Sequence, residues 1–539
     1  MKKFILSAVC FYIFSLTFAQ QVRNLIPNIQ GTTHNYWCTW YSQLEVGKNA
    51  VSSVEELLKD SASSIPRSSL NEQHLFAKDG WAMTYYSDSK KDLLLMFDDG
   101  WDVPYKNSEK YWGSIEPDKT RFPSCTGTPG QRLKKLVALT KKAGWRGVGL
   151  WICAQEFEAD TTALKFKDKK HYELEFWTKR LQWSHEGGVD YWKIDWGGKG
   201  GSIEFRSLIS ELARKYAPGL IVEQAICISP LNYGIHNRLP QDIIENAYKH
   251  FAFSDVFRTY DVTLQLAVPT TLERTAQYLK YQGKSNTILN CDDEIYISAV
   301  LGFASGILRF PVDSQYVASH KVYPFMLGEK FMVTYDINRH IDEVKRMVNW
   351  QKIMPAFSLG ESKSQIDSTL LSDSWLYGDI DTWDTKIIGK TITQAAPARI
   401  ARNMPLPIVK ANGESPYVVA ARHPNGAVAV GTYGRVTPEI GYKPALADVE
   451  IQVDKQKTNL IGVFGFYKSL KLNLNETSVQ IQVWAQDLAG KSARNITSEV
   501  KIEQNSIFIS GEILKRIGLS AATKGDKSEP GLVIQLTSN

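Results

Sequence analysis

Residues 188–198 read Gly-Val-Asp-Tyr-Trp-Lys-Ile-Asp-Trp-Gly-Gly, which is the pattern of a short buried β-strand that stops at two glycines. Alternate residues of a strand project to the same face, so we expect Lys193 and Asp195 to lie side by side at its carboxyl end. A cation and a carboxylate at the end of an apolar strand are costly to desolvate unless they serve a site. An ordinary salt bridge between the two is the simpler alternative.

Apolar strands alternate with helical patterns between about residues 34 and 313. The expected strands are Tyr36–Tyr41, Leu93–Asp98, Gly147–Cys153, Val189–Asp195, Leu220–Ala225, Asp255–Val262, Ser285–Asn290 and Ile307–Val312. The expected helices are Gln131–Ala143, His171–His185, Ile203–Tyr216, Gln241–Phe251, Thr271–Tyr281 and Glu294–Ala304. Eight such units over roughly 300 residues predict a (β/α)8 TIM barrel, and an open doubly wound sheet is the alternative.

The pattern changes at about residue 360. Short alternating apolar runs, such as Tyr417–Ala421, Ala427–Thr432 and Val449–Val453, replace the helical periodicity, and turn residues separate them. These runs predict an all-β, sandwich-like domain. We therefore expect the chain of 539 residues to form a barrel over residues 20–355 and a C-terminal β-sandwich over residues 356–539.

The first residues have the pattern of a cleavable signal peptide. Two lysines precede an apolar run from Phe4 to Phe18, and residues 17–19 read Thr-Phe-Ala, with small residues before the expected cleavage site. Residues 1–19 are thus expected to direct export to the periplasm or the medium of a bacterium. No later segment has the roughly 20 uninterrupted apolar residues of a membrane span. Removal of residues 1–19 lowers the formal net charge from +6 to +4, and the remaining chain has no basic block that would indicate nucleic-acid binding.

Cysteine and histidine usage bears on metals and cofactors. The cysteines after residue 19 are Cys38, Cys125, Cys153, Cys227 and Cys291. Their odd number leaves at least one thiol unpaired, and no two have the Cys-x-x-Cys spacing of a zinc site. The chain has only 9 histidines. We therefore expect no metal and no cofactor, and a metal-dependent hydrolase is the weaker alternative.

Charged and aromatic side chains gather at the carboxyl ends of the expected strands, where barrel enzymes hold their catalytic groups. In chain order they are Asp98, Asp99, Trp151, Lys193, Asp195, Glu223, Arg258, Asp261, Asp292 and Asp293, and the sixth strand also carries Asp255. An aspartate at a strand end often caps the next helix, and capping is the alternative for Asp292 and Asp293 in particular. A group of carboxylates with Trp, Arg and Lys fits glycoside hydrolysis, in which one carboxylate attacks the anomeric carbon and another protonates the leaving oxygen.

Four motifs resemble those of the clan D glycoside hydrolases, the α-galactosidases and α-N-acetylgalactosaminidases of families 27 and 36. They are Asp98-Asp99-Gly100-Trp101, Tyr191-Trp192-Lys193-Ile194-Asp195, Phe257-Arg258-Thr259-Tyr260-Asp261 and Asn290-Cys291-Asp292-Asp293. The resemblance covers about residues 34–315 and keeps the order and spacing of the motifs. It implies an exported, retaining exo-glycosidase that acts on terminal α-galactosides or on a relative such as a β-L-arabinopyranoside or an α-N-acetylgalactosaminide.

The resemblance also implies roles for single residues. Asp195 would be the nucleophile that forms a covalent glycosyl-enzyme, and Asp261 would be the acid/base. The substrate-binding residues would be Trp40, Asp98, Asp99, Trp151, Lys193, Trp196, Glu223 and Arg258. Within this set, Asp98 and Asp99 would hold the hydroxyls at positions 4 and 6. In retaining glycosidases the two catalytic carboxyl groups lie about 5–5.5 Å apart.

The chain departs from the family 27 pattern at three places. Glu223-Gln224 lacks the family's usual neighbours, which leaves the specificity at position 2 of the sugar open. Trp196 follows Asp195 where the relatives carry a small residue, which alters the wall beside the anomeric centre. Arg258 and Asp261 are three residues apart rather than four, and Asp255, which follows a serine as in family 36, is a rival acid/base. A non-catalytic carbohydrate-binding protein is the alternative from another class. In both cases the expected partner is an oligo- or polysaccharide.

Overall fold

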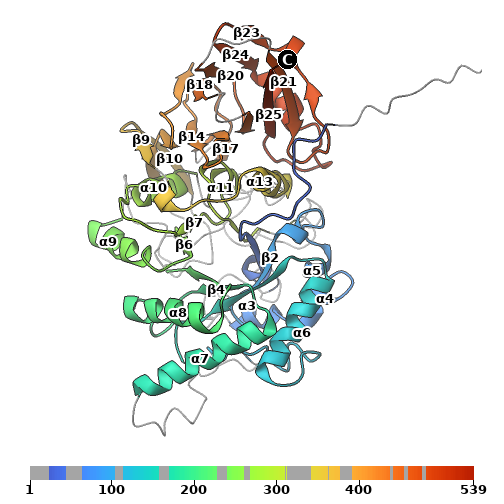
Figure 1. The fold of residues 1–539 in the computed structure, drawn as a ribbon, viewed down its shortest axis with the longest axis vertical. Coiled ribbons are helices and arrows are strands. Elements are labelled where there is room, and N and C mark those ends of the chain that lie inside the picture. The colour runs from blue at the N-terminus through green and yellow to red at the C-terminus, as the bar shows by residue number, and fades with distance from the viewer. Residues whose placement is uncertain are drawn as a thin grey trace, which may run out of the picture.

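The computed structural model of the protein describes residues 23–43, 46, 64–103, 113–156, 169–226, 239–259, 268–309, 311, 341–361, 363–376, 391–437, 441–454, 459–475 and 481–538. The expected signal peptide, residues 1–19, lies outside them. Figure 1 shows a barrel with surrounding helices, drawn in blue to green, and beside it a group of β-sheets drawn in orange to red. Within the described residues, no helix is long and apolar enough to cross a membrane.

A sheet of eight parallel strands forms the barrel. Its strands are β1 (Tyr36–Cys38), β2 (Leu94–Phe97), β3 (Gly147–Ile152), β4 (Tyr191–Ile194), β5 (Ile221–Gln224), β6 (Val256–Arg258), β7 (Ile288–Asn290) and β8 (Gly306–Ile307). β8 pairs with β1, and Asn290 at the end of β7 bridges to Ala304 just before β8, so the sheet closes on itself. Nearly all of these residues are buried, as expected of parallel strands covered by helices. The structure confirms the predicted (β/α)8 barrel.

Helices cover the outside of the barrel between successive strands (Figure 1). They are α6 (Pro129–Lys142), α7 (Lys169–Gly187), α8 (Ile203–Tyr216), α9 (Gln241–His250), α10 (Val268–Tyr278) and α11 (Ile295–Leu301). Polar caps fix where some of them begin. Thr128 and Gln131 form a capping box at α6, and Ser202 accepts the amide N–H of Phe205 at α8. The short helices α3 (Ser64–Ser69), α4 (Glu72–Phe76) and α5 (Trp81–Thr84) lie between β1 and β2.

All eight barrel strands are shorter than the sequence predicts. β7 begins at Ile288 rather than at Ser285, and β8 covers Gly306–Ile307, so Leu308 and Arg309 lie outside it. β1 ends at Cys38 rather than at residue 41, because the carbonyl of Thr39 accepts the amide N–H of Gln43 and starts a helical turn. β6 begins after Asp255 rather than at it. Residues 260–262, which were expected to end this strand, lie outside the described residues.

The carboxylates after β7 do not cap the next helix. The N-cap of α11 is Glu294, and no side chain forms a capping hydrogen bond there. Asp293 instead accepts the amide N–H groups of Leu308 at 2.9 Å and of Arg309 at 3.2 Å. The capping alternative for Asp292 and Asp293 is therefore wrong, and Asp293 instead holds the chain that follows β8.

The chain after residue 363 forms a β-sandwich. One sheet has the strand order β22-β21-β25-β19-β15-β14-β12-β9, and the other has the order β13-β18-β20-β24-β23. Their bounds are β9 (Ser364–Ile366), β12 (Arg399–Arg402), β13 (Ile408–Ala411), β14 (Tyr417–Arg422), β15 (Val428–Tyr433), β18 (Ala447–Val453), β19 (Leu460–Phe464), β20 (Ser469–Leu474), β21 (Ile481–Asp487), β22 (Arg494–Asn495), β23 (Lys501–Glu503), β24 (Ser506–Ser510) and β25 (Gly531–Ser538). Apolar residues of both sheets share one core, which includes Val430, Val449 and Leu472. The predicted all-β, sandwich-like domain is thus confirmed.

Smaller elements complete this domain. The strands β10 (Leu370–Leu376) and β11 (Thr391–Pro397) pair with each other and pack on α10, and β16 (Arg435–Thr437) pairs with β17 (Gly441–Lys443). The helix α14 (Gly511–Gly518) buries Leu514 and Ile517. The boundary expected at residue 355 falls between α13 (Ile341–Ile353) and β9.

A buried ion pair joins the barrel side of the chain to the sandwich. Arg346 on α13 donates from Nε and Nη2 to the two carboxylate oxygens of Asp487 at the end of β21, at 3.0 and 3.2 Å. The exposed fractions of the two side chains are 0% and 1%. Such a pair is costly to break from one side, because the remaining charge stays buried without its partner.

The first described residues lie along the sandwich. The amide N–H of Leu25 donates to Gln486 at 2.7 Å, and the guanidinium of Arg23 lies 4.5 Å from the ring centre of Trp484. The same guanidinium donates to Gln535 on β25, the last strand. The beginning and the end of the described chain are therefore held together.

We expect Arg346→Met to lower the free energy of unfolding by about 3–5 kcal/mol, because it leaves Asp487 buried without a counter-charge. Lys345→Met on the same helix is the matched control. Lys345 pairs with an exposed carboxylate, Asp88, and its loss is expected to cost less than about 1 kcal/mol. Denaturant unfolding of both variants measures the difference, and equal losses would contradict the role given to Arg346.

Candidate active site

The carboxyl ends of β4 and β6 bring Asp195 and Arg258 into contact. Asp195 follows β4 directly, and Arg258 is the last residue of β6. Nη2 of Arg258 lies 3.1 Å from Oδ1 of Asp195, and Nη1 lies 3.4 Å from Oδ2, so the guanidinium spans both carboxylate oxygens. Both side chains are almost fully buried. This ion pair marks the centre of the candidate site.

Two further donors hold the Asp195 carboxylate. Nε1 of Trp151 donates to Oδ2 at 3.1 Å, and the backbone N–H of Trp196 donates to Oδ1 at 2.9 Å. Trp151 reaches Asp195 because it lies on β3, which pairs with β4. Donors on both oxygens stabilise the ionised carboxylate and fix its orientation. An oriented, ionised carboxylate at this end of a barrel can act as a nucleophile.

Lys193 joins Asp195 to the aspartate pair after β2. Its ammonium group lies 2.9 Å from Oδ2 of Asp98 and 3.8 Å from Oδ2 of Asp195. Lys193 and Asp195 share one face, as the strand alternation predicts, but the closer partner of Lys193 is Asp98. Burial acts to lower the pKa of Lys193, but the neighbouring acidic groups, Asp98 foremost, together more than offset it, so the pKa is raised well above its ordinary value. Lys193 therefore stays cationic between the two carboxylates.

Cys38 adds a neutral donor to this group. Its thiol donates to Oδ2 of Asp98 at 2.9 Å. Burial and the charge of Asp98 raise the pKa of the Cys38 thiol well above its ordinary value, so the thiol keeps its proton. Oδ1 of Asp98 accepts the backbone N–H of Asp99 at 2.8 Å. Both oxygens of Asp98 are thus engaged by protein donors.

Asp99 has a cation partner that the sequence analysis did not identify. Nη2 of Arg67, in α3, lies 2.5 Å from Oδ2 of Asp99, and both side chains are buried. Burial raises the pKa of Asp99 above its ordinary value, and the charge of Arg67 opposes this rise. Arg67 precedes Asp99 by 32 residues, in a connection without motif or periodicity. The one available signal is general: connections that follow barrel strands reach the site.

Aromatic side chains form one wall beside Asp195. The rings of Trp151 and Trp196 meet edge to face, with ring centres 5.7 Å apart. With Val103 and Cys153 they form a small apolar cluster. Trp196 and Trp40 are both partly exposed, and Trp40 follows β1 at the same end of the barrel. The predicted aromatic residues therefore all lie toward the carboxyl ends of the strands.

Glu223 lies deeper in the barrel than Asp195. Its register partner on β4 is Lys193, and its side chain is fully buried. The carboxylate accepts the Tyr191 hydroxyl at 2.7 Å and the Asn290 amide at 3.0 Å. Burial and the charge of Glu223 raise the pKa of Asp292 well above its ordinary value. Glu223 is thus part of a buried polar layer beneath the site.

The two candidates for the acid/base have different outcomes. Asp255 precedes β6, whereas Arg258 ends it, so they lie at opposite ends of the strand, about 10 Å apart along it. The Asp255 carboxylate accepts the backbone N–H of Val222 at 2.9 Å at the amino end of the barrel. The structure does not bring Asp255 to Asp195. Asp261 lies outside the described residues, so its expected distance to Asp195 stays a prediction.

Metal-ligating side chains and cysteines are the other groups that could form a site or a cross-link. The part of the chain that the structure describes has no group of three or more His, Cys, Asp or Glu side chains placed to hold a metal ion. The cysteines in the same part, Cys38, Cys125, Cys153 and Cys291, are buried free thiols. Cys227 lies outside the described residues.

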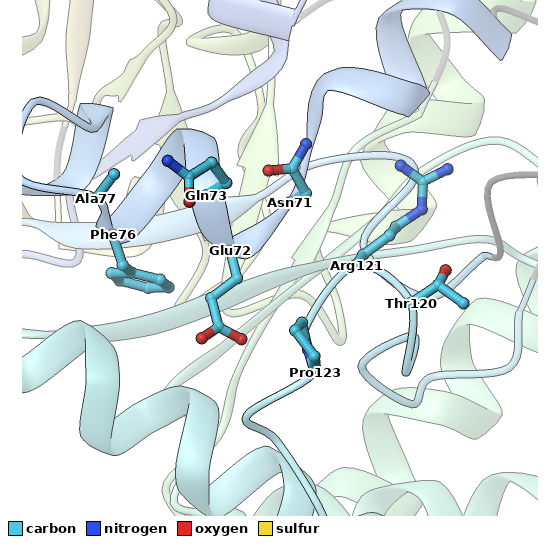
Figure 2. Close-up of a pocket in the computed structure, with 8 residues that line it drawn as sticks. All are labelled: Asn71, Glu72, Gln73, Phe76, Ala77, Thr120, Arg121 and Pro123. Carbon is cyan, nitrogen blue, oxygen red and sulfur yellow. The ribbon is translucent and has the colours of Figure 1, made fainter.

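A hollow beside α4 contains none of the predicted site residues (Figure 2). Figure 2 shows Arg121 in its wall, with the guanidinium directed away from the Glu72 carboxylate. This guanidinium donates to the backbone carbonyls of Arg67 and, at 3.3 Å, of Leu70. The wall of the hollow therefore supports the segment that carries Arg67.

Comparison with known proteins gives remote likenesses only. No protein-family model matches the chain, and no curated protein matches its sequence. Among solved structures, it is similar to a family GH27 β-L-arabinopyranosidase from Geobacillus stearothermophilus in complex with arabinose, at 11% identity, covering 94% of this chain and 97% of the other, with a TM-score of 0.37.

Two further structures show the same degree of likeness. One is a candidate α-galactosidase from Bacteroides fragilis, at 12% identity, covering 94% of this chain and 79% of the other, with a TM-score of 0.36. The other is a candidate α-N-acetylgalactosaminidase from Bacillus halodurans, at 10% identity, covering 96% of this chain and 100% of the other, with a TM-score of 0.35. Likeness of this degree assigns no activity to the chain.

Proposed function

We propose that this protein is an exported, retaining exo-glycosidase that cleaves terminal α-galactosides through a covalent glycosyl-enzyme on Asp195. The observation that carries the proposal is the Asp195 carboxylate at the carboxyl end of β4, held by Arg258, Trp151 and the Trp196 amide. Barrel enzymes place their chemistry at this end of the sheet. A carboxylate held by donors on both oxygens is suited to attack one defined carbon.

The proposed reaction has two balanced steps. In the first, Asp195 forms a bond to the anomeric carbon, the bond from that carbon to the leaving oxygen breaks, and Asp261 protonates the leaving oxygen. In the second, Asp261 removes a proton from water, the water oxygen bonds to the anomeric carbon, and the ester to Asp195 breaks. Two inversions give net retention of configuration.

The charges of the site favour an uncharged sugar. Each of the three aspartates has a buried cation partner: Asp98 has Lys193, Asp99 has Arg67 and Asp195 has Arg258. A charged substrate would enter this balanced group without a free counter-charge, which is costly in a buried site. Terminal α-galactosides, β-L-arabinopyranosides and α-N-acetylgalactosaminides are all neutral at the sugar unit. Galactose and L-arabinopyranose differ by a hydroxymethyl group, so both belong in the test.

Export is part of the proposal. The basic and apolar pattern of residues 1–19 supports export. An exported enzyme would meet its oligo- or polysaccharide substrate in the periplasm or the medium. Expression of the full chain in a bacterial host, with N-terminal sequencing of the fractionated product, tests this point. A mature chain that begins near residue 20 is expected, and an uncleaved cytoplasmic product would contradict export.

A panel of nitrophenyl glycosides tests the activity. We expect hydrolysis of the α-galactoside or of the β-L-arabinopyranoside, unchanged by chelators, and NMR of the first-formed sugar is expected to show retained configuration. Sugar binding without turnover would favour a non-catalytic carbohydrate-binding protein instead. An inverted first product would contradict the covalent mechanism.

We expect Trp151→Phe to lower kcat/KM by about 10- to 100-fold, because it removes a hydrogen bond to the charged Asp195 while keeping an aromatic ring. Trp145→Phe is the matched control. The Trp145 indole donates to the backbone carbonyl of Ala82, so the same substitution there is expected to leave kcat/KM unchanged. Equal kinetics of the two variants would contradict a role for the Trp151 indole in holding Asp195.

A further inference from the structure

Arg67 is the buried cation that pairs with Asp99. It lies in α3, in the connection after β1, and its Nη2 is 2.5 Å from Oδ2 of Asp99. The exposed fractions of the two side chains are 1% and 5%. Its guanidinium also lies 5.9 Å from the ring centre of Trp196, the residue after the proposed nucleophile. Arg67 thus contacts two residues of the candidate site.

The position of Arg67 is fixed by the chain around it. Arg121 donates to the backbone carbonyl of Arg67 and to that of Val103. Gly100 has a φ of +110°, and a Cβ there would lie 2.9 Å from the Cβ of Arg67. Gly100 follows Asp99 directly, so the glycine of the Asp98-Asp99-Gly100-Trp101 motif is what allows α3 to approach Asp99 this closely.

Among the described residues, only one of the two carboxylate oxygens of Asp99 accepts a hydrogen bond. Oδ2 accepts from Arg67, whereas Oδ1 is buried and has no hydrogen-bond partner among the residues that the structure describes. A buried carboxylate oxygen without a donor is costly, so a donor supplied by a ligand would gain free energy there. Asp98 differs, because both of its oxygens already accept from protein groups. Asp99 is therefore the aspartate of this pair that can still accept from a sugar.

We propose that Arg67 is a positioning residue that holds Asp99 so that its Oδ1 accepts one hydroxyl donated by the substrate. The inference rests on the proposed function, because it takes the ligand to be a neutral sugar. With Oδ2 held by Arg67, Asp99 cannot bind two sugar hydroxyls through separate oxygens. The arginine also supplies the charge that keeps Asp99 an acceptor in a buried site.

A double-mutant cycle separates positioning from simple packing. We expect Arg67→Met to weaken sugar binding by about 10-fold or more, and Arg67→Lys, which keeps a cation, to recover part of that loss. In an Asp99→Asn background, Arg67→Met is expected to have less than about a 2-fold further effect, because Arg67 acts through Asp99. The same factor in both backgrounds would overturn the proposal. Thermal melting checks that each variant folds, and Arg67→Lys keeps the cycle available if Arg67→Met does not fold.

The measurement is made in a form that does not depend on turnover. Calorimetric titration with D-galactose, L-arabinose and N-acetyl-D-galactosamine gives the dissociation constant for each of the variants. If the wild-type protein binds a sugar but cleaves no glycoside, the proposed activity fails while the cycle still decides the role of Arg67. Where turnover is found, loss of the Arg67 charge is expected to raise the pKa of Asp99 and move the acidic limb of kcat/KM to higher pH. An unmoved limb would contradict the proposed action through Asp99.

Discussion

Asp195→Asn is expected to reduce hydrolysis by at least about 10³-fold, because the variant keeps the size of the side chain but lacks a nucleophilic carboxylate. In the wild-type protein Arg258 and Trp151 both donate to Oδ2 of Asp195, and the NH2 group of an asparagine at that position could not accept from them. Initial rates on the best nitrophenyl glycoside measure the effect. We expect the loss in kcat rather than in KM, since the nucleophile acts at the transition state.

Asp190→Asn is the matched control for this experiment. Asp190 precedes the same strand at its opposite end, where its carboxylate accepts the backbone N–H of Val148 at 2.9 Å. The asparagine carbonyl can accept the same bond, so the activity of this variant is expected to stay within about 2-fold of wild type. If Asp195→Asn kept more than a tenth of the wild-type rate, Asp195 would not be the nucleophile.

The second large effect is expected at the acid/base. Asp261→Asn should lower hydrolysis of an unactivated disaccharide by about 10²- to 10⁴-fold, the usual contribution of general acid catalysis. A nitrophenolate leaves with little protonation, so the first step on nitrophenyl glycosides should suffer less. Parallel kinetics on an aryl glycoside and on the matching disaccharide measure this contrast.

Asp255→Asn discriminates between the two candidates. Because Asp255 lies at the amino end of β6 and accepts the Val222 N–H, its replacement is expected to leave kcat on both substrates near the wild-type value. A selective loss on the disaccharide in Asp255→Asn, with Asp261→Asn unaffected, would reverse the assignment. A similar loss in both variants would indicate that neither acts alone as the acid/base.

The sequence predicts the barrel well because its signals are local. Strand β3 and helix α8 lie almost where hydrophobic periodicity places them, and the alternation of β4 correctly sets Lys193 and Asp195 on one face. The end of β1 is less well predicted, since the apolar run continues to Tyr41 while Thr39 begins a turn. Periodicity reports burial, and a buried helical turn has the same composition as a buried strand.

Site residues are harder to predict, because contacts between segments that are distant in the sequence determine which residues belong to the site. Arg67 carries no motif or periodicity that marks it, and it reaches the site through a 2.5 Å contact with Asp99, which lies 32 residues later in the chain. Glu223 belongs to β5 and Asp255 directly precedes β6, but composition does not show how deep in the barrel either side chain lies. Register places Glu223 inside the barrel and Asp255 at its amino end.

The contact between the first described residues and the last strand has a consequence for the order of assembly. Arg23 and Leu25 contact Trp484, Gln486 and Gln535, and these partners are synthesised only near the end of the chain. Domains generally fold in chain order as they emerge, so the barrel is complete before its leading segment finds a place. A chain that ends before β25 lacks Gln535, so it would lose one of the contacts that hold Arg23 on the sandwich.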